Sequence, residues 1–170
     1  MADQEFPPVI VTYDTTIDAP VEAVWNCISD FGGWCKWTSS FVNMEIEGDG
    51  VDRVGCVRKF QSAETKSIYE EREQEKDNVN HVFKFTNVSS SPQIVFLKSQ
   101  LVTVTVTPDG DNRCSIHYVV DIKTNMLIPE DKVAGFQAMG KKTYDRMFGD
   151  LKNYVENNKK TNTEKFEVSL

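Results

Sequence analysis

Residues 129–157, PEDKVAGFQAMGKKTYDRMFGDLKNYVEN, are the stretch of sequence that decides the fold. Pro129 suits a first helical turn, and apolar residues then recur at helical spacing with lysines and acids between them. The members of this apolar stripe are Val133, Phe136, Gly140, Tyr144, Met147, Phe148, Leu151, Tyr154 and Val155. The pattern predicts a helix that is long for a globular protein, and its stripe needs a large apolar surface to cover it.

The preceding residues, 41–123, are expected to supply that surface. They contain six runs of strand-forming residues separated by turn signals such as GDG at 48–50 and PDGDN at 108–112. This arrangement predicts a strongly curved antiparallel meander. Within residues 102–107, VTVTVT, valines alternate with threonines, so one face of the sheet is expected to be dry.

The first forty residues add one strand and the shorter helices. Residues 9–17, VIVTYDTTI, alternate like a strand, and a short amphipathic helix is predicted at 18–31 with Asp18 as its cap. The glycine pair and two tryptophans that follow indicate a break or a second short helix. Trp34 and Trp37 either flank the mouth of a cavity or cover the core.

The sequence thus predicts an α+β fold. A curved antiparallel sheet of about seven strands wraps around a long C-terminal helix, and two short helices follow the first strand. Because curvature lifts the middle strands off the helix, we expect an internal cavity, a usual place for a ligand site. We expect residues 1–8 to form an N-terminal arm, 9–157 a single ligand-binding domain, and 158–170 a polar tail.

Composition argues against several classes of function. The net charge of −7 repels phosphate backbones and anionic lipid surfaces, so we expect no binding to nucleic acid. The chain has no membrane-spanning window and no signal-peptide pattern, which predicts a cytoplasmic protein without integral membrane association. Four scattered cysteines and two distant histidines predict neither disulfides nor a metal site, and no cofactor motif is present.

The segment GCVRKF, 55–60, places a charge among apolar neighbours. At period two, Arg58 shares a face with Cys56 and Phe60, and an unpaired guanidinium on a buried face is costly. Glu71 on the next strand is the natural partner, although hydrophobicity does not decide which face of that charged strand points inward. Arg58 is then part of a structural ion pair, an arginine that reaches out to water, a ligand contact, or half of a catalytic pair.

The order of elements and four motifs resemble a known superfamily. The motifs are IDAPVEAVWNCISDFGGWCKW, VGCVRKF, YEERE and VTVTPDG. Over roughly residues 9–157 the chain resembles the helix-grip superfamily, which includes START domains, birch-pollen-type allergens, abscisic acid receptors and polyketide cyclase/dehydrase-like proteins. Resemblance to one enzyme branch, the plant lachrymatory factor synthases, implies catalytic roles for Arg58 and Glu71. A tyrosine of those synthases falls near Gln100 here, and this departure weakens the transfer of their chemistry.

The residues and the resemblance together give a set of candidate ligand contacts, whose aromatic members either fill the core or line the cavity. They are Arg58, Phe60, Glu71, Phe83, Phe85, Gln100, Tyr118, Phe136 and Tyr144.

We expect a soluble binding or transport protein for a hydrophobic small molecule, such as a lipid, a sterol or a polyketide-like compound. The alternative is a cyclase, dehydratase or isomerase in which Glu71 moves a proton and Arg58 steadies an oxyanion, without metal or covalent nucleophile. A third interpretation is a ligand sensor whose loops, such as SSSPQ at 89–93, present a surface to a protein partner.

Overall fold

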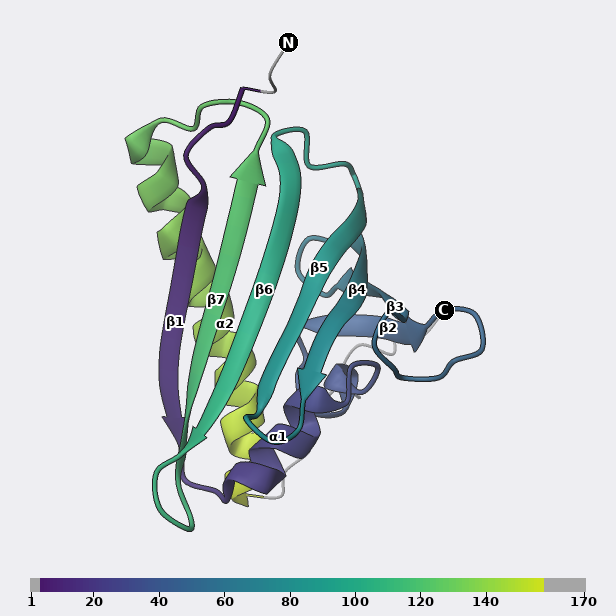
Figure 1. Ribbon diagram of the computed structural model, residues 1–170, viewed down its shortest axis with the longest axis vertical. Coiled ribbons are helices and arrows are strands. Elements are labelled where there is room, and N and C mark those ends of the chain that lie inside the picture. Colours follow the sequence, from purple (N-terminus) through teal and green to yellow (C-terminus); the bar gives the residue numbers. More distant parts are fainter. Residues whose placement is uncertain (1–3, 158–170) are drawn as a thin grey trace.

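The computed structural model describes residues 4–157 of the chain (Figure 1). Its elements in chain order are β1 (Val9–Ile17), α1 (Val21–Ser29), the 3₁₀ helix η1 (Trp34–Lys36), β2 (Phe41–Ile46), β3 (Val57–Ser62), β4 (Ile68–Asp77), β5 (Val82–Ser91), β6 (Leu97–Pro108), β7 (Cys114–Thr124) and α2 (Glu130–Asn157). The predicted polar tail, 158–170, lies outside the described residues, as do the first three residues of the predicted arm.

The strands form one antiparallel sheet of seven strands in the order β1-β7-β6-β5-β4-β3-β2. Helix α2 runs diagonally across one face of this sheet, and α1 lies at the end where the last turns of α2 lie (Figure 1). The predicted α+β architecture, including the two short helices after β1, is confirmed. Within residues 4–157 no helix is long and apolar enough to cross a membrane.

The alternation along β6 explains how the sheet acquires its dry face. Val102, Val104 and Val106 are each 1% exposed or less, while the threonines between them point to the other face. In the neighbouring strand β7, Ile116 and Val120 are also buried, with exposed fractions of 0% and 2%. The predicted dry face is therefore confirmed, and it is the face that α2 covers.

Helix α2 is covered unevenly along its length. Met147, Phe148 and Leu151 in its second half are buried, whereas Val133 and Phe136 in its first half are only half-buried. Burial of such a large apolar side chain contributes about 1.5–3 kcal/mol relative to exposure. The core is therefore densest under the second half of α2, and the predicted internal cavity stays a prediction.

The helix α1 begins differently from the prediction. Pro20, with φ −58° and ψ 142°, occupies the N-cap position, and no side chain caps the helix. The backbone N–H of Asp18 instead donates a hydrogen bond to Glu156 Oε1 at 2.8 Å. The predicted cap at Asp18 is wrong because the extended Pro20 separates this residue from the first helical turn.

Two strand boundaries also differ. Gly55 has φ +92°, a turn conformation that suits glycine, so β3 begins only at Val57 and Cys56 lies in the turn before it. Residues 89–91 belong to β5, so the predicted loop at 89–93 is shortened to the segment that follows this strand.

Candidate functional site

Arg58 and Glu71 lie directly opposite each other on β3 and β4, and both are buried. Arg58 Nε and Nη2 donate hydrogen bonds to the same oxygen, Glu71 Oε2, at 2.9 and 2.6 Å. Arg58 Nη1 donates to the carbonyl oxygen of Phe31 at 3.0 Å. The predicted pair is therefore formed, and its location is the interior: Arg58 is 1% exposed and does not reach water.

Four aromatic rings surround the guanidinium of Arg58. Its Cζ lies 4.1 Å from the ring centroid of Phe31, 4.2 Å from that of Trp34, 4.9 Å from Phe85 and 5.3 Å from Phe60. The negative face of an aromatic ring attracts a cation, by about 0.5–2 kcal/mol for each ring. The carboxylate, the carbonyl and the rings together compensate the loss of water around this charge.

Glu71 keeps one oxygen free of the arginine. Within the described part of the chain Oε1 accepts no hydrogen bond, and 10% of the side chain remains accessible. Burial raises the pKa of Glu71, and the charge and hydrogen bonds of Arg58 oppose that rise. The carboxylate therefore keeps one oxygen that Arg58 does not use, on a side chain that is mostly buried.

Two tyrosines lie near this carboxylate. The rings of Tyr118 on β7 and Tyr144 on α2 are 4.6 Å apart, and Tyr118 is 5% exposed. Burial raises the pKa of both phenols, and the negative charge of Glu71 raises them further. Both side chains are thus neutral at ordinary pH, and each hydroxyl can donate or accept a hydrogen bond.

The structure divides the predicted contacts into four groups. Phe60 and Phe85 join the Arg58–Glu71 pair, and Tyr118 and Tyr144 form the tyrosine pair beside it. Phe83 packs edge-on against Phe31 and is fully buried in the core. Gln100 is half-buried on β6, and Phe136 contacts Phe96 with centroids 5.2 Å apart, so neither is brought to the Arg58–Glu71 pair by a described contact.

Sequence reasoning missed two of the rings around Arg58, those of Phe31 and Trp34. Trp34 is 1% exposed, and its Nε1 donates to the carbonyl of Ile28 at 3.0 Å. Trp37 is equally buried, so both tryptophans are part of the core. The only sequence signal for these rings is the close spacing of Phe31, Trp34 and Trp37 after α1. This spacing does not indicate that the rings contact Arg58.

A second polar cluster adjoins the pair. Asp52, Cys56 and Glu73 bring their carboxylate and thiol atoms within 4.8 Å of one another, a grouping that resembles a set of metal ligands. Lys76 Nζ, however, lies 2.6 Å from Asp52 Oδ1 and 3.3 Å from Glu73 Oε1. The chain therefore supplies the positive charge of this cluster from its own lysine.

The acids of this cluster titrate differently. Burial, and then the neighbouring Asp52, raise the pKa of Glu73 to about 7. Burial opposes ionisation of Asp52 as well, but hydrogen bonds from Lys76 and Glu73 outweigh it and lower the pKa of Asp52. Asp52 is thus ionised near neutral pH, the range in which Glu73 titrates.

The loop between β3 and β4 is held against α2. Glu64 Oε2 lies 3.1 Å from Arg146 Nη2, and the N–H of Ala63 donates to the carbonyl of Ser40 at 2.9 Å. This loop therefore bridges from the sheet to the helix on the side of the molecule where β3 ends.

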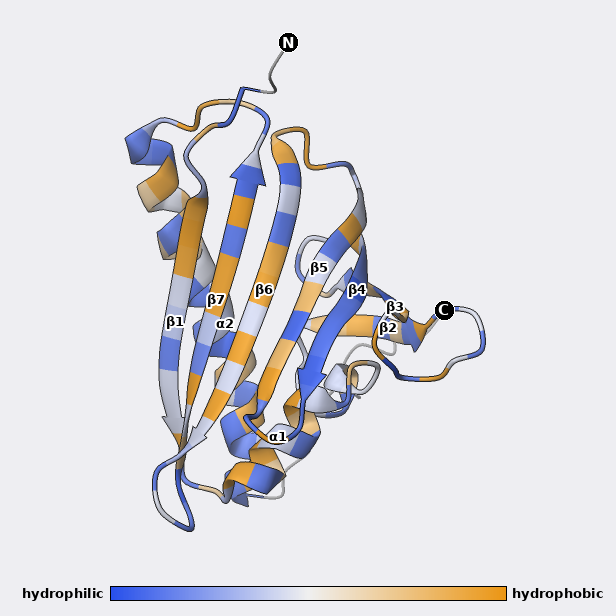
Figure 2. Cartoon of the chain, in the orientation of Figure 1, coloured by the Kyte–Doolittle hydropathy of each residue, from blue (hydrophilic) through white to orange (hydrophobic). Residues whose placement is uncertain are grey.

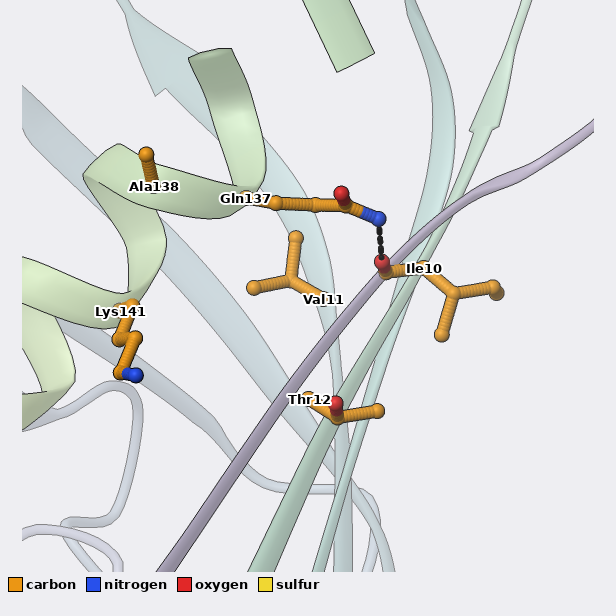
Figure 3. A pocket seen from close by; sticks show the side chains of 6 residues that line it. All are labelled: Ile10, Val11, Thr12, Gln137, Ala138 and Lys141. Carbon is orange, nitrogen blue, oxygen red and sulfur yellow. Dashed lines mark hydrogen bonds between the residues drawn. The ribbon is translucent and has the colours of Figure 1, made fainter. Parts of the chain in front are cut away.

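A groove on the surface lies between β1 and the first half of α2, and none of the predicted residues lines it (Figure 3). Its volume is about 340 Å³, and its lining residues are Ile10, Val11, Thr12, Gln137, Ala138 and Lys141. Gln137 Nε2 donates to the carbonyl of Ile10 at 3.0 Å and so ties the helix to the edge strand across it (Figure 3).

Comparison with known proteins gives a family and a fold. A family model described as polyketide cyclase / dehydrase and lipid transport matches residues 8–156. No curated protein sequence matches the chain.

Three solved structures illustrate the similarity of fold. Norcoclaurine synthase from Thalictrum flavum, in complex with dopamine and hydroxybenzaldehyde, has TM-score 0.69 and 16% identity over 91% of this chain and 90% of that one. A START superfamily protein from Mycobacterium smegmatis has TM-score 0.69 and 13% identity over 88% and 99%. Ara h 8.0201 has TM-score 0.71 and 18% identity over 89% and 100%. At these identities the likeness shows the fold alone.

Proposed function

The chain belongs to the polyketide cyclase / dehydrase and lipid transport family, and from that membership we propose that it binds or carries a hydrophobic small molecule between the sheet and α2. The ligand is lipid-, sterol- or polyketide-like, and its polar end lies at Glu71. Arg58, already committed to Glu71 and Phe31, holds the carboxylate in place. The tyrosine pair Tyr118 and Tyr144 completes the polar end of the site.

One observation carries this proposal. Both hydrogen bonds from Arg58 to Glu71 go to Oε2, so Oε1 accepts none from the described residues, and the Glu71 side chain is 10% accessible. A ligand that brings a donor can give Oε1 the hydrogen bond that these residues do not supply. The aromatic side chains around Arg58 offer apolar contact for the rest of such a molecule.

The same geometry selects the chemistry of the ligand. Glu71 repels an anionic headgroup when it is ionised, and Arg58 has three of its N–H groups engaged and lies between rings. A neutral ligand with a hydroxyl or N–H group therefore fits better than a carboxylate or sulfonate.

A matched pair of fluorescent probes tests this preference. N-phenyl-1-naphthylamine is neutral and carries one N–H donor, and 1-anilinonaphthalene-8-sulfonate has the same body with an added sulfonate. We expect the neutral probe to bind the wild type more tightly than the sulfonate probe does. In the Glu71→Gln variant the difference between the two affinities should be smaller, because the charge that repels the sulfonate is removed. Glu70→Gln is the control, since Glu70 faces the other side of β4. Absence of binding by either probe, or equal binding of both, would contradict the proposal.

A second candidate function, proton-transfer catalysis in the same site, is favoured by the raised pKa of Glu71 together with its free oxygen. Solvent deuterium provides a test that needs no known substrate. A ligand that copurifies with the protein is incubated with it in D₂O, and its mass is followed. Catalysis predicts protein-dependent uptake of deuterium at carbon that is lost in Glu71→Gln while binding is retained, whereas a carrier catalyses no uptake.

A further inference from the structure

Phe31 is held from both sides of its backbone. Its N–H donates to Asp52 Oδ2 at 2.7 Å, and its carbonyl oxygen accepts the hydrogen bond of Arg58 Nη1 at 3.0 Å. Its ring is fully buried, 4.1 Å from the guanidinium. Because α1 ends at Ser29, no helical hydrogen-bond ladder fixes the backbone of Phe31. These contacts therefore decide where its carbonyl and its ring lie.

Asp52 is in turn fixed by β4. It lies in the irregular segment between β2 and β3, and its Oδ1 accepts a hydrogen bond from Lys76 Nζ at 2.6 Å. Lys76 also lies 3.3 Å from Glu73 Oε1, and Glu73 is two residues from Glu71 on the buried face of the same strand. A bulge between residues 73 and 75 brings Lys76 to this position.

The contacts thus form a chain that begins and ends on β4. It runs from Glu71 through Arg58 and Phe31 to Asp52, and then through Lys76 to Glu73, two residues further along the strand. An ionised acceptor makes its hydrogen bond shorter and stronger, so the Asp52 carboxylate holds the N–H of Phe31 firmly. The N–H and the carbonyl of Phe31 belong to adjacent peptide units, so this bond acts on the carbonyl by fixing the position of the Phe31 backbone, and the carbonyl then receives Arg58.

We propose that Asp52 is a positioning residue of the Arg58–Glu71 site, acting through the Phe31 backbone and without touching the ligand. Asp52 fixes Phe31, Phe31 fixes the guanidinium, and the guanidinium fixes which oxygen of Glu71 stays free. The ligand-binding consequence rests on the proposed function, but the positioning itself does not.

The positioning is tested without a ligand by NMR of the Arg58 Nε–H and of the Phe31 amide. The Arg58 Nε–H is buried and donates to Glu71, so its proton reports the geometry of the pair. Asp52→Asn is expected to move both resonances. Asp49→Asn is the matched control: Asp49 lies in the same segment but is paired with the exposed Arg53. An Arg58 Nε–H that does not move in Asp52→Asn overturns the proposal.

A titration of the wild-type protein gives a second test that does not depend on a variant folding. Ionisation of Glu73 changes the charge beside Lys76, and the groups that face Glu73 are Asp52, Cys56 and Lys76. We expect the Phe31 amide and the Arg58 Nε–H to shift together between pH 6 and pH 8, since the pKa of Glu73 is about 7. An amide of Phe31 that titrates while Arg58 stays fixed refutes the coupling.

The effect on binding is measured with N-phenyl-1-naphthylamine. Asp52→Asn is expected to weaken its binding by roughly threefold to tenfold, and Asp49→Asn to leave it unchanged. If the probe binds the wild type but Asp52→Asn leaves its affinity unchanged, the positioning role for the ligand is wrong. If the probe binds neither protein, the proposed function fails, while the NMR result still decides the positioning.

Discussion

Replacing Glu71 by glutamine removes the counter-charge of a guanidinium that is only 1% exposed. The glutamine has the same shape and keeps an acceptor oxygen, and the Phe31 carbonyl and four rings still surround Arg58. Breaking a buried ion pair by removing one partner costs about 3–5 kcal/mol. With the retained acceptor, we expect a loss of about 2–4 kcal/mol in the free energy of unfolding.

The neighbouring residue provides the matched control. Glu70 lies on the opposite face of β4, where its carboxylate is 3.7 Å from Lys59 Nζ and both side chains are partly exposed. Such surface pairs contribute about 0–1 kcal/mol, so Glu70→Gln is expected to change stability by less than that. The two variants carry the same chemical change one residue apart.

Urea unfolding of the two variants and the wild type measures the difference. We expect a lower midpoint for Glu71→Gln with an unchanged slope, and a midpoint near that of the wild type for Glu70→Gln. Equal losses of unfolding free energy in the two variants would refute the reasoning. They would mean that the buried Arg58–Glu71 pair contributes no more to stability than the partly exposed Lys59–Glu70 pair.

Two further predictions concern the frame of the site. A Cβ at Gly140 would lie 2.8 Å from Val11 Cγ1, so Gly140→Ala should lower the free energy of unfolding by about 1–3 kcal/mol. Gly135 has open space around it, so Gly135→Ala should raise the free energy of unfolding by about 0.5–1 kcal/mol, as measured by thermal or urea unfolding. An increase for both variants contradicts the close approach of Gly140 to Val11. Because the pKa of Glu73 is raised from 4.5 to about 7 in the folded state, the stability linked to this group is fully present below 4.5 and lost as the pH rises through about 7. The free energy of unfolding of the wild type, relative to Glu73→Gln, should therefore fall between pH 5 and pH 8 by at most about 3 kcal/mol, and a parallel pH dependence of the two proteins contradicts this.

Regular patterns made most of the fold predictable from the sequence. The valines of β6 and the stripe of α2 each carry a period that only one secondary structure satisfies, and β1 has the bounds predicted for it. The boundaries that were wrong lie where backbone conformation overrides composition. Pro20 delays the start of α1, and the positive φ of Gly55 delays the start of β3.

The candidate site was predictable only in part. Arg58 is identified by alternation alone, because a charge on an apolar face requires a partner. The strand β4 gave no such signal, since it is almost uniformly hydrophilic (Figure 2), and its buried face follows from its place between β3 and β5. Two glutamates of that strand, Glu71 and Glu73, are buried in spite of this composition.

The remaining members of the site depend on contacts between distant segments. Phe31 reaches Arg58 from the turn after α1, and Asp52 reaches Phe31 from an irregular segment with no periodicity. The bulge in β4 that turns Lys76 inward breaks the alternation on which a sequence argument relies. None of these residues carries a local pattern, so only the folded chain brings them together.

Native mass spectrometry of the freshly purified protein tests the central claim most directly. We expect a bound species of one molecule per chain that organic extraction releases as a neutral hydrophobic compound with a hydroxyl or N–H group. It also predicts less of that species on Glu71→Gln than on Glu70→Gln. A protein that carries no such molecule and takes up no N-phenyl-1-naphthylamine would contradict the account.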